Sequence, residues 1–426
     1  RCLRVALGGE REAGLSARNF RLVLAGQAVS LMGGAVQRVC IALYLLELTG
    51  SAGVYSAVLA ASALPYVLCA PMAGAVADAF NRRDVMVMLD AACALVMGCF
   101  AATLFAGVRS VPLAAAVMVL LAVAATFYSP AVSACIPQIV PAGKLARANG
   151  AVSMVGSWCN MLGPVVAGVL YAAAGIEWAC LLYAACLAAS ALFETRIQIR
   201  GVPGARRSVR DVLAVGPTLR SMCGTLGELR RSYPVVLGVI ASYGLVNVFV
   251  LPINTVLLPS ALMLDMGVTS EVYGLVEGLA ACGMVAGAAL VAALPSRFAF
   301  VRCSRWYAIL PLVLAAMGVA FAWRAAIGPA AVLCGLAVGA MAVMLCLGVT
   351  NVVTLTYNQT HVPVSMLGSL SALSTAFASS TVPVGQLAFG AALEADIGCS
   401  VLLFVASLAS LAVCAFVRWN VRRRCD

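Results

Sequence analysis

The sequence holds few of the residues that metal, haem and phosphate chemistry require. Its 426 residues include one histidine, His361, and none of the 17 cysteines stands in a CxxC pair. A structural zinc site takes four closely spaced Cys or His ligands, and haem enzymes commonly use histidine ligands. The sequence also shows no Walker phosphate loop and no paired nucleophile and base. We therefore expect no metal site, no cofactor, no catalytic residues and no ATP-driven pump.

Charged and aromatic residues are also scarce. Charged residues make up 10% of the chain and aromatic residues 7%, whereas hydrophobic residues make up 63%. A soluble domain of this length needs far more polar residues to cover its surface. The shortage of aromatic rings also argues against a binding cavity built wholly on stacking. The composition, with a mean hydropathy of +1.04, predicts an integral membrane protein.

Long apolar runs occupy most of the chain. Runs of about 18 or more such residues are long enough to cross a bilayer as helices. Helices are expected because lipid offers the backbone no hydrogen-bond partner. Most cysteines fall inside these runs, where Cys acts as a small apolar residue and not as half of a disulfide. We predict an all-α integral membrane protein with twelve transmembrane helices, over 20–47, 52–78, 83–107, 111–136, 145–174, 177–194, 234–260, 270–295, 303–323, 329–356, 364–393 and 397–418.

The formal net charge of +11 is distributed unevenly among the loops between these runs. With the N-terminus placed in the cytoplasm, nearly every loop Lys and Arg falls on the cytoplasmic side, with Arg109 and Arg324 as exceptions. The outer loops carry acids such as Asp265 and Glu394. This asymmetry follows the positive-inside rule. It predicts a multi-pass protein of the cell (plasma) membrane, embedded in the lipid bilayer with both termini cytoplasmic, and no nucleic-acid partner.

The longest polar stretch divides the chain into two halves of six runs each. It covers 195–233 and is basic and interrupted by Gly and Pro, as expected of a cytoplasmic linker. The motifs GPVVAG at Gly163–Gly168 and GQLAFG at Gly385–Gly390 keep an offset of 222 residues. Two parallel six-helix repeats around a central cavity are a known transporter architecture. We predict an N-terminal bundle at 1–194, a linker at 195–233, and a C-terminal bundle with a basic cytoplasmic tail at 234–426.

The stretch GAVADAFNRRDVM, residues 74–86, places charges between the second and third runs. Through Gly74, Asp78, Arg82 and Arg83 it resembles the loop signature of the major facilitator superfamily, Gly-x-x-x-Asp-(Arg/x)-x-Gly-Arg-(Arg/Lys). Gly74 removes a side chain where helices approach closely, and Asp78 can pair with either arginine or with a helix N-terminus of the other half. Such contacts would close the cytoplasmic mouth in one state and break in the other. The alternative is a basic loop that only fixes the topology.

Two neighbouring residues bear on the same signature. Asn81 stands where Gly is usual, and because Asn tolerates left-handed backbone we expect it to form a tight turn. Asp90 lies two turns into the third run, and the resemblance implies that it supports the charge network of the signature. The alternative for Asp90 is a structural acid that reaches toward the inner interface.

The resemblance covers the chain over about 19–414. Stretches such as NFRLVLAGQAVSLMGG and YGLVEGLAACGMVAGAAL are similar to the macrolide-efflux-like branch of drug–proton antiporters. In the fifth run, Gly156, Gly163, Pro164 and Gly168 resemble the antiporter signature. Its glycines allow tight helix packing and its proline a bend, which would seal the interface between the halves. The signature favours export, and the alternative is ordinary helix packing.

Two ionisable residues lie deep in the predicted spans, where charges are costly and usually mark transport pathways. At 1.5 Å per residue, Arg38 lies about 13 Å from Glu47, and Glu277 lies about 9 Å from Glu271. Opposite charges at similar depth predict an Arg38–Glu277 pair across the halves, in which Glu277 takes up a proton and Arg38 tunes its proton affinity. The alternatives are a structural ion pair and an arginine that extends outward.

Uncharged polar residues in the runs are candidates for lining a central cavity. The resemblance places the first, fourth, seventh and tenth helices at the centre of the fold. This criterion selects Gln37, Asn247, Asn254 and Asn351. The alternative for each is a hydrogen bond between helices. Pro252 and Pro259 are expected to interrupt the backbone hydrogen bonds of the seventh helix.

Together these features predict a secondary transporter that works as a monomer by alternating access. Its cargo would be a small amphipathic organic compound, drug-like or a natural metabolite, exported in exchange for protons, which is the activity of an antibiotic-resistance antiporter. The alternative is a permease for one metabolite such as a siderophore or a lipid. A more remote alternative is a membrane enzyme or scaffold without transport activity.

Overall fold

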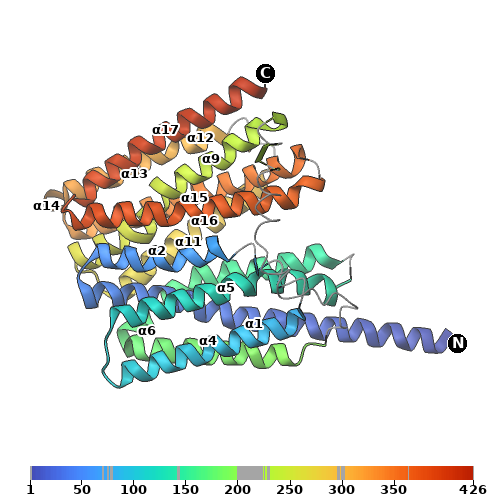
Figure 1. Ribbon diagram of the computed structural model, residues 1–426. Helices are drawn as coiled ribbons and strands as arrows, with labels where there is room; N and C mark the ends of the chain where they lie inside the picture. Colours follow the sequence, from blue (N-terminus) through green and yellow to red (C-terminus); the bar gives the residue numbers. More distant parts are fainter. Residues whose placement is uncertain are drawn as a thin grey trace. The chain divides into compact units, whose positions relative to one another are not determined.

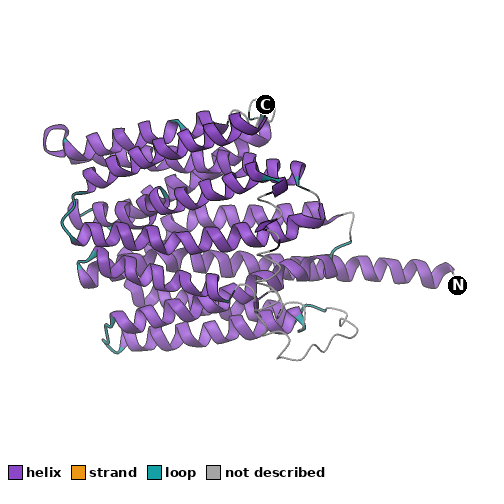
Figure 2. Cartoon of the chain, turned by 45° about the horizontal axis from the view of Figure 1, so that its top comes forward, coloured by secondary structure: helices purple, strands orange, loops and turns teal. Residues whose placement is uncertain are grey.

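The computed structural model describes residues 2–69, 72–73, 76, 80–141, 144–198, 224, 226–227, 231–294, 298, 303–362 and 364–425. Helices joined by short loops account for nearly all of them, and no strand occurs among these residues (Figure 2). The predicted all-α class is therefore confirmed.

Ten of the described helices are long and apolar enough to cross a membrane. The helix α6 contains two of the expected spans, because Gly175 has φ 78° and ψ −175° and interrupts the helical backbone between them. The helix α2 is shorter, with 17 residues. The twelve predicted spans are thus all found, and the chain is a multi-pass membrane protein. The main helices are α1 (Cys2–Thr49), α2 (Ala52–Leu68), α4 (Arg82–Phe105), α5 (Val111–Ile139), α6 (Leu145–Thr195), α9 (Pro234–Phe249), α11 (Ser270–Ala293), α13 (Ile309–Ala322), α15 (Pro329–His361), α16 (Val364–Glu394) and α17 (Cys399–Cys425). The spans that contain α9 and α13 also include neighbouring helical segments and cover Pro234–Asp265 and Arg305–Ala322.

Contacts divide the chain into two compact units. The first unit comprises the described residues of Arg1–Ile41 and Leu68–Val215, and the second those of Ala42–Val67 and Gly216–Asp426. The end of α1 and the helix α2 therefore group with the second unit, although they belong to the first half of the sequence. The predicted linker at 195–233 falls mostly outside the described residues, so the proposed domain boundaries stay a prediction.

The first unit is built from α1, α4, α5 and α6 (Figure 1). The helix α5 begins at Ser110, whose side chain accepts a hydrogen bond from the Leu113 amide at 3.4 Å. At one end of the unit, apolar residues from all four helices pack into a cluster, which we call the apolar plug. Its buried members are Val23, Met86, Ala131, Val132, Cys135, Ile136, Ile139, Val140, Ala148 and Ile197.

In the second unit, α11 and α15 pack backbone against backbone. A methyl group at Gly283 or Gly287 of α11 would overlap a carbonyl oxygen of α15, and one at Gly348 of α15 would overlap a carbonyl of α11. Small residues of this kind let membrane helices approach closely. In the same unit α13 lies against α17, and α9 lies against α16 and α17 (Figure 1).

The seventh span is interrupted as its prolines predict. After α9, the backbone continues through π-helical segments at Ile253–Leu257 and Ala261–Asp265, separated by the short helix α10 (Leu258–Ser260). Pro252 precedes the first segment and Pro259 lies in α10, just before the second. A proline lacks the N–H that the regular ladder needs, so the ladder shifts register there. The remaining short helices of the unit are α12 (Cys303–Tyr307) and α14 (Arg324–Ile327).

Candidate functional site

The second unit encloses a cavity of about 560 Å³ between α9, α11, α12, α15 and α16. This volume lies within the range of about 300–1,000 Å³ that is typical of small-molecule sites. The residues that line it are Tyr243, Val246, Asn247, Leu251, Met284, Tyr307, Met344, Leu347, Thr350, Asn351, Leu355, Asn358, Leu370, Ser374, Thr375 and Ala378. None of these described residues carries a charge, and apolar side chains are interspersed with hydroxyl and amide groups.

The face of α15 gives the cavity its mixed character. Leu347, Asn351, Leu355 and Asn358 follow one another at spacings of three and four residues, which places them on one side of the helix. Opposite them, the Tyr243 hydroxyl of α9 lies 3.3 Å from Asn351 Oδ1, close enough to donate a hydrogen bond. This wall therefore alternates apolar contact with hydrogen-bonding groups along the helix.

Two polar atoms beside the cavity have no hydrogen-bond partner among the described residues. They are Asn358 Oδ1 on α15 and Ser374 Oγ on α16, and both atoms are buried. A buried polar atom without a partner is costly and calls for an explanation such as a ligand or water. The cavity can thus accept an apolar molecule and offer it an acceptor and a hydroxyl at one end.

The predicted cavity residues divide between the cavity and other places. Asn247 and Asn351 line the cavity, and Asn247 Nδ2 also donates to the Ala378 carbonyl at 3.1 Å. Gln37 is buried in the first unit, where its Nε2 lies 3.6 Å from Cys180 Sγ, so it makes a contact between α1 and α6. Asn254 lies in the first π-helical segment, is 5% exposed and does not line the cavity.

The gate signature is only partly described. Gly74 and Asp78 lie outside the described residues, so their part in the gate stays a prediction. Arg82 and Arg83 form the first turn of α4, and Arg83 Nε is 3.9 Å from Asp84 Oδ1. Asn81 does not adopt the left-handed backbone expected for its turn: its φ is −65°, and its side chain accepts a hydrogen bond from the Arg83 amide at 3.1 Å. Asn81 therefore caps the start of α4.

The two deep charges have different partners within their own units. Arg38 Nη2 donates to Asn160 Oδ1 of α6 at 2.7 Å. Glu277 accepts a hydrogen bond from the Tyr273 hydroxyl, one turn earlier on α11, at 3.3 Å. The predicted Arg38–Glu277 pair joins residues of different units and stays a prediction.

The antiporter-like motif packs inside the first unit. A methyl group at Gly163 would overlap Ala35 of α1, whereas one at Gly156 would have only Leu31 Cδ1 within 4.0 Å. Pro164 and Gly168 are buried beside it in α6. Tight packing is thus observed for Gly163 and not for Gly156, and its partner is α1. The expected role of the motif in sealing the two halves stays a prediction.

A buried polar cluster in the first unit went unnoticed in the sequence. The Tyr128 hydroxyl donates to Glu194 Oε1 at 2.6 Å, and Gln27 Nε2 donates to the Tyr128 hydroxyl at 2.7 Å. Asp90 lies close enough to Glu194 for their charges to interact. Glu194 is the last acid before the basic linker, so it resembled an interfacial residue. Its burial depends on α6 continuing to Thr195 beside α1 and α5.

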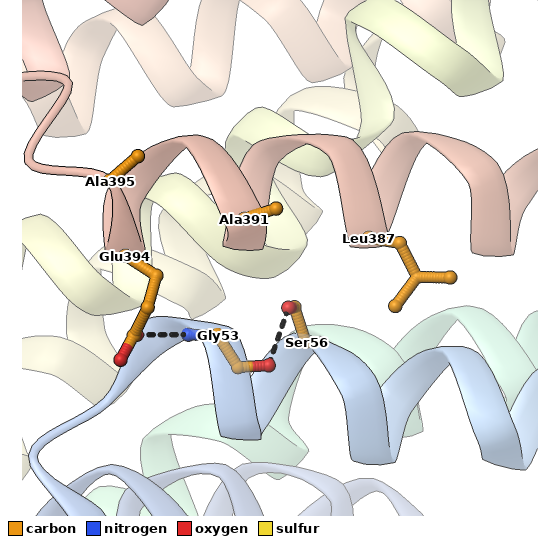
Figure 3. Close-up of a pocket in the computed structure, with 6 residues that line it drawn as sticks. All are labelled: Gly53, Ser56, Leu387, Ala391, Glu394 and Ala395. Carbon is orange, nitrogen blue, oxygen red and sulfur yellow. Dashed lines mark hydrogen bonds between the residues drawn. The ribbon is translucent and has the colours of Figure 1, made fainter.

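In the second unit, a polar contact joins the start of α2 to the end of α16 (Figure 3). Glu394 Oε2, at the end of α16, accepts hydrogen bonds from Ser51 Oγ at 2.8 Å and from the Gly53 amide at 3.2 Å. It therefore serves as a capping acceptor for the first turn of α2. One turn earlier on α16, Gly390 packs directly against Ser56. A shallow groove runs along this contact, lined also by Leu387 and by Ala391 and Ala395.

Comparisons with known proteins agree with this architecture. The family profile described as the Major Facilitator Superfamily matches residues 23–386. The chain is 31% identical over 152 residues to macrolide efflux protein A of Streptococcus pyogenes, a region that covers 36% of this chain and 38% of that protein. The matched region therefore spans well under half of the curated relative.

Solved transporters share the fold at low sequence identity. A bacterial homologue of the iron transporter ferroportin, in an inward-facing state, has a TM-score of 0.68 and 19% identity over 95% of this chain and 99% of that chain. A bacterial homologue of the human lysosomal transporter Spinster has a TM-score of 0.70 and 15% identity over 95% and 97%. These likenesses concern the fold.

Proposed function

Because this chain belongs to the Major Facilitator Superfamily and is a transporter and not an enzyme, we propose that it exports neutral, amphipathic organic molecules across the cell membrane in exchange for protons. In this proposal both termini lie in the cytoplasm, and the protein works as a monomer. The cargo binds in the cavity of the second unit, and alternating access exposes it to each side in turn.

The observation that carries the proposed substrate class is the lining of the cavity. A permanently charged ligand would need an opposite charge to offset its loss of water. The described lining offers instead apolar side chains together with the Asn247, Asn351 and Asn358 amides and the Ser374 hydroxyl. Such a surface favours ligands that are largely apolar and carry a few neutral hydrogen-bonding groups.

Two observations support export as the direction. The region that resembles macrolide efflux protein A is 31% identical to it, and that protein is named for efflux. The motif Gly163-Pro164 with Gly168 resembles the antiporter signature at the sequence level. Export of drug-like compounds would place the chain among antibiotic-resistance transporters.

Accumulation in cells tests the proposal. An efflux-deficient bacterial host expressing the chain is loaded with the neutral dye Nile red, with the cationic dye ethidium, and with a macrolide. We expect less Nile red in expressing cells than in cells with an empty vector, little change for ethidium, and loss of the difference when an uncoupler is added.

A cavity variant and a matched control connect the activity to the site. Asn351→Leu should raise the KM for Nile red efflux about fivefold, because one hydrogen bond contributes about 1 kcal/mol. Thr356→Val, on the same helix but outside the lining, should leave the KM unchanged. Equal accumulation of every compound with and without the chain would overturn drug export and favour a permease for a single metabolite.

A further inference from the structure

The polar cluster of the first unit lies inside its helix bundle and shares no residue with the lining of the cavity in the second unit. Glu194 is 1% exposed and Asp90 is 4% exposed. Ser190 of α6 is 0% exposed and lies beside Asp90 and Tyr128, yet its hydroxyl has no well-formed hydrogen bond. Ionisable residues placed this deep in a membrane protein are costly, and they commonly mark ion pathways.

Hydrogen bonds hold one oxygen of Glu194 in place and leave other polar atoms open. Tyr128 donates to Glu194 Oε1, and Gln27 in turn donates to Tyr128. Among the described residues, no well-formed hydrogen bond reaches Glu194 Oε2, Asp90 Oδ2 or the Ser190 hydroxyl, although Ser190 lies beside Asp90. A proton on either carboxyl would supply the missing donor, since a carboxylate only accepts hydrogen bonds.

Among the described residues, no basic side chain forms an ion pair with either carboxyl. The charge of Arg82 acts on Cys135 of α5, and Cys135 also lies in the field of Glu194. On α4, Cys93 lies in the field of Asp90. Two ionised carboxylates at such a site repel each other, so the favoured state keeps at least one proton on the pair.

The apolar plug separates this cluster from one end of the bundle. Gln27, Asp90, Tyr128 and Glu194 each have a plug residue three or four positions away in the chain, toward the same end of the bundle, so the plug covers the cluster on one side. The matching plug residues are Val23 before Gln27, Met86 before Asp90, Val132 after Tyr128 and Ile197 after Glu194. Water is thereby kept from the carboxyl pair at that end, and proton exchange depends on the state of the bundle.

We propose that Asp90 and Glu194 together bind one exchangeable proton, positioned by Tyr128 and Gln27, and that this proton is the coupling ion. The assignment of a coupling role rests on the proposed proton-driven export. On uptake, one proton binds to the carboxylate pair, and the net charge of the pair changes from −2 to −1. On release, the proton leaves to water and the two carboxylates again oppose each other. Glu277 of α11 is the alternative binding site for the coupling proton.

Infrared difference spectroscopy measures proton binding without any transported compound. The purified chain in lipid is taken through a pH step, and the carbonyl band of protonated carboxyl groups is recorded. We expect a band in the wild type that is lost in Glu194→Gln and is shifted in Asp90→Asn. Glu177→Gln, on the same helix but half-buried and paired with Arg109, serves as the matched control and should leave the band unchanged.

Tyr128→Phe tests the positioning role. It removes the hydrogen bond to Glu194. We expect it to shift the pH midpoint at which the carbonyl band titrates and to leave the amplitude of the band unchanged. Thermal unfolding of each variant shows whether the fold is intact. An unchanged band in both Glu194→Gln and Asp90→Asn would overturn the proposal, as would a band lost only in Glu277→Gln.

Transport in proteoliposomes then separates the two proposals. With Nile red as the probe, a coupling variant should lose accumulation driven by a pH gradient at least tenfold while keeping dye exchange at equilibrium. Gradient-driven transport that Glu194→Gln leaves intact overturns the coupling role. A titrating band in a wild type that moves none of the test compounds would confirm proton binding by the pair and refute drug export.

Discussion

Gly163 carries no side chain at the point where α6 crosses α1, and its absence determines how closely the two helices pack. A Cβ at this position would overlap Ala35. The same motif offers a natural comparison, because Gly156 lies two turns earlier with no atom closer than 4.0 Å to a Cβ. The two glycines look alike in the sequence, yet only one lies at a close helix contact.

We expect Gly163→Ala to lower the stability of the protein by about 1–3 kcal/mol, because overpacking a helix contact forces the backbones apart. Gly156→Ala should leave stability unchanged or raise it by less than about 1 kcal/mol, since alanine favours the helix. Thermal unfolding in detergent measures both effects. Equal unfolding midpoints for the two variants would contradict the packing assigned to Gly163.

Ser374 illustrates how a binding group can weaken the empty protein. Its hydroxyl is buried at the cavity without a hydrogen-bond partner among the described residues. We expect Ser374→Ala to stabilise the empty protein by about 1 kcal/mol, since a buried unsatisfied group carries a desolvation cost of that order. The same change should weaken binding of Nile red several-fold, measured by fluorescence titration.

Ser380→Ala provides the control for that experiment. Ser380 is an exposed residue of α16 that donates to the Phe377 carbonyl at 2.8 Å and does not line the cavity. The control should leave dye affinity unchanged. A Ser374→Ala protein that is less stable than the wild type and binds dye equally well would exclude the proposed role of the hydroxyl.

At the level of helices, the contact between α2 and α16 depends on one carboxylate. Glu394→Ala removes the acceptor for Ser51 Oγ and for the Gly53 amide. We expect amide hydrogen exchange over 51–56 to become about five to thirty times faster, because one to two hydrogen bonds of about 1 kcal/mol each are lost. Exchange measured by mass spectrometry tests this expectation.

Asp396→Asn is the companion variant for the α2–α16 contact. Asp396 lies two residues further along, is exposed, and its φ of 61° is a conformation that asparagine also adopts. Exchange over 51–56 should match the wild type in this variant. Slow exchange that persists in Glu394→Ala would mean that other contacts hold the start of α2.

The helices themselves could be predicted from apolar length, whereas their interruptions could be predicted only in part. The run from 145 to 194 reads as two spans, and the structure joins them at Gly175 without a polar loop, because a glycine with positive φ can reverse the direction within one residue. The prolines at 252 and 259 marked the breaks in the seventh span. The π-helical form of those breaks depends on packing that the sequence does not show.

Across the whole molecule, single polar residues were harder to place than spans. Asn247 and Asn351 lie at the cavity, but Gln37, which also carries an amide side chain, faces Cys180 instead. Which side of a helix faces a neighbour depends on tertiary packing, and apolar periodicity is weak in a helix that is apolar all round. Glu194 was missed for a related reason, because the same residue types occur at the ends of buried spans and in loops at the membrane interface.

The predicted topology provides a test at this scale. In a variant whose cysteines are replaced, a single cysteine at position 83 or at position 396 is treated with a membrane-impermeant thiol reagent in intact cells. We expect labelling at Asp396→Cys and none at Arg83→Cys until the membrane is opened, as the positive-inside rule requires. Labelling of both positions from the same side would refute the predicted orientation.

The close glycine contact between α11 and α15 holds these two helices together as one rigid element. Met284 of α11 and Met344 of α15 belong to the same wall of the cavity, so that wall keeps its shape. The opposite wall contains α16, which has Pro383 inside it, and α9, which ends before Pro252. We therefore expect α9 and α16 to be the helices that adapt to larger or smaller cargo. Under selection for transport of new compounds, substitutions should appear first in these two helices.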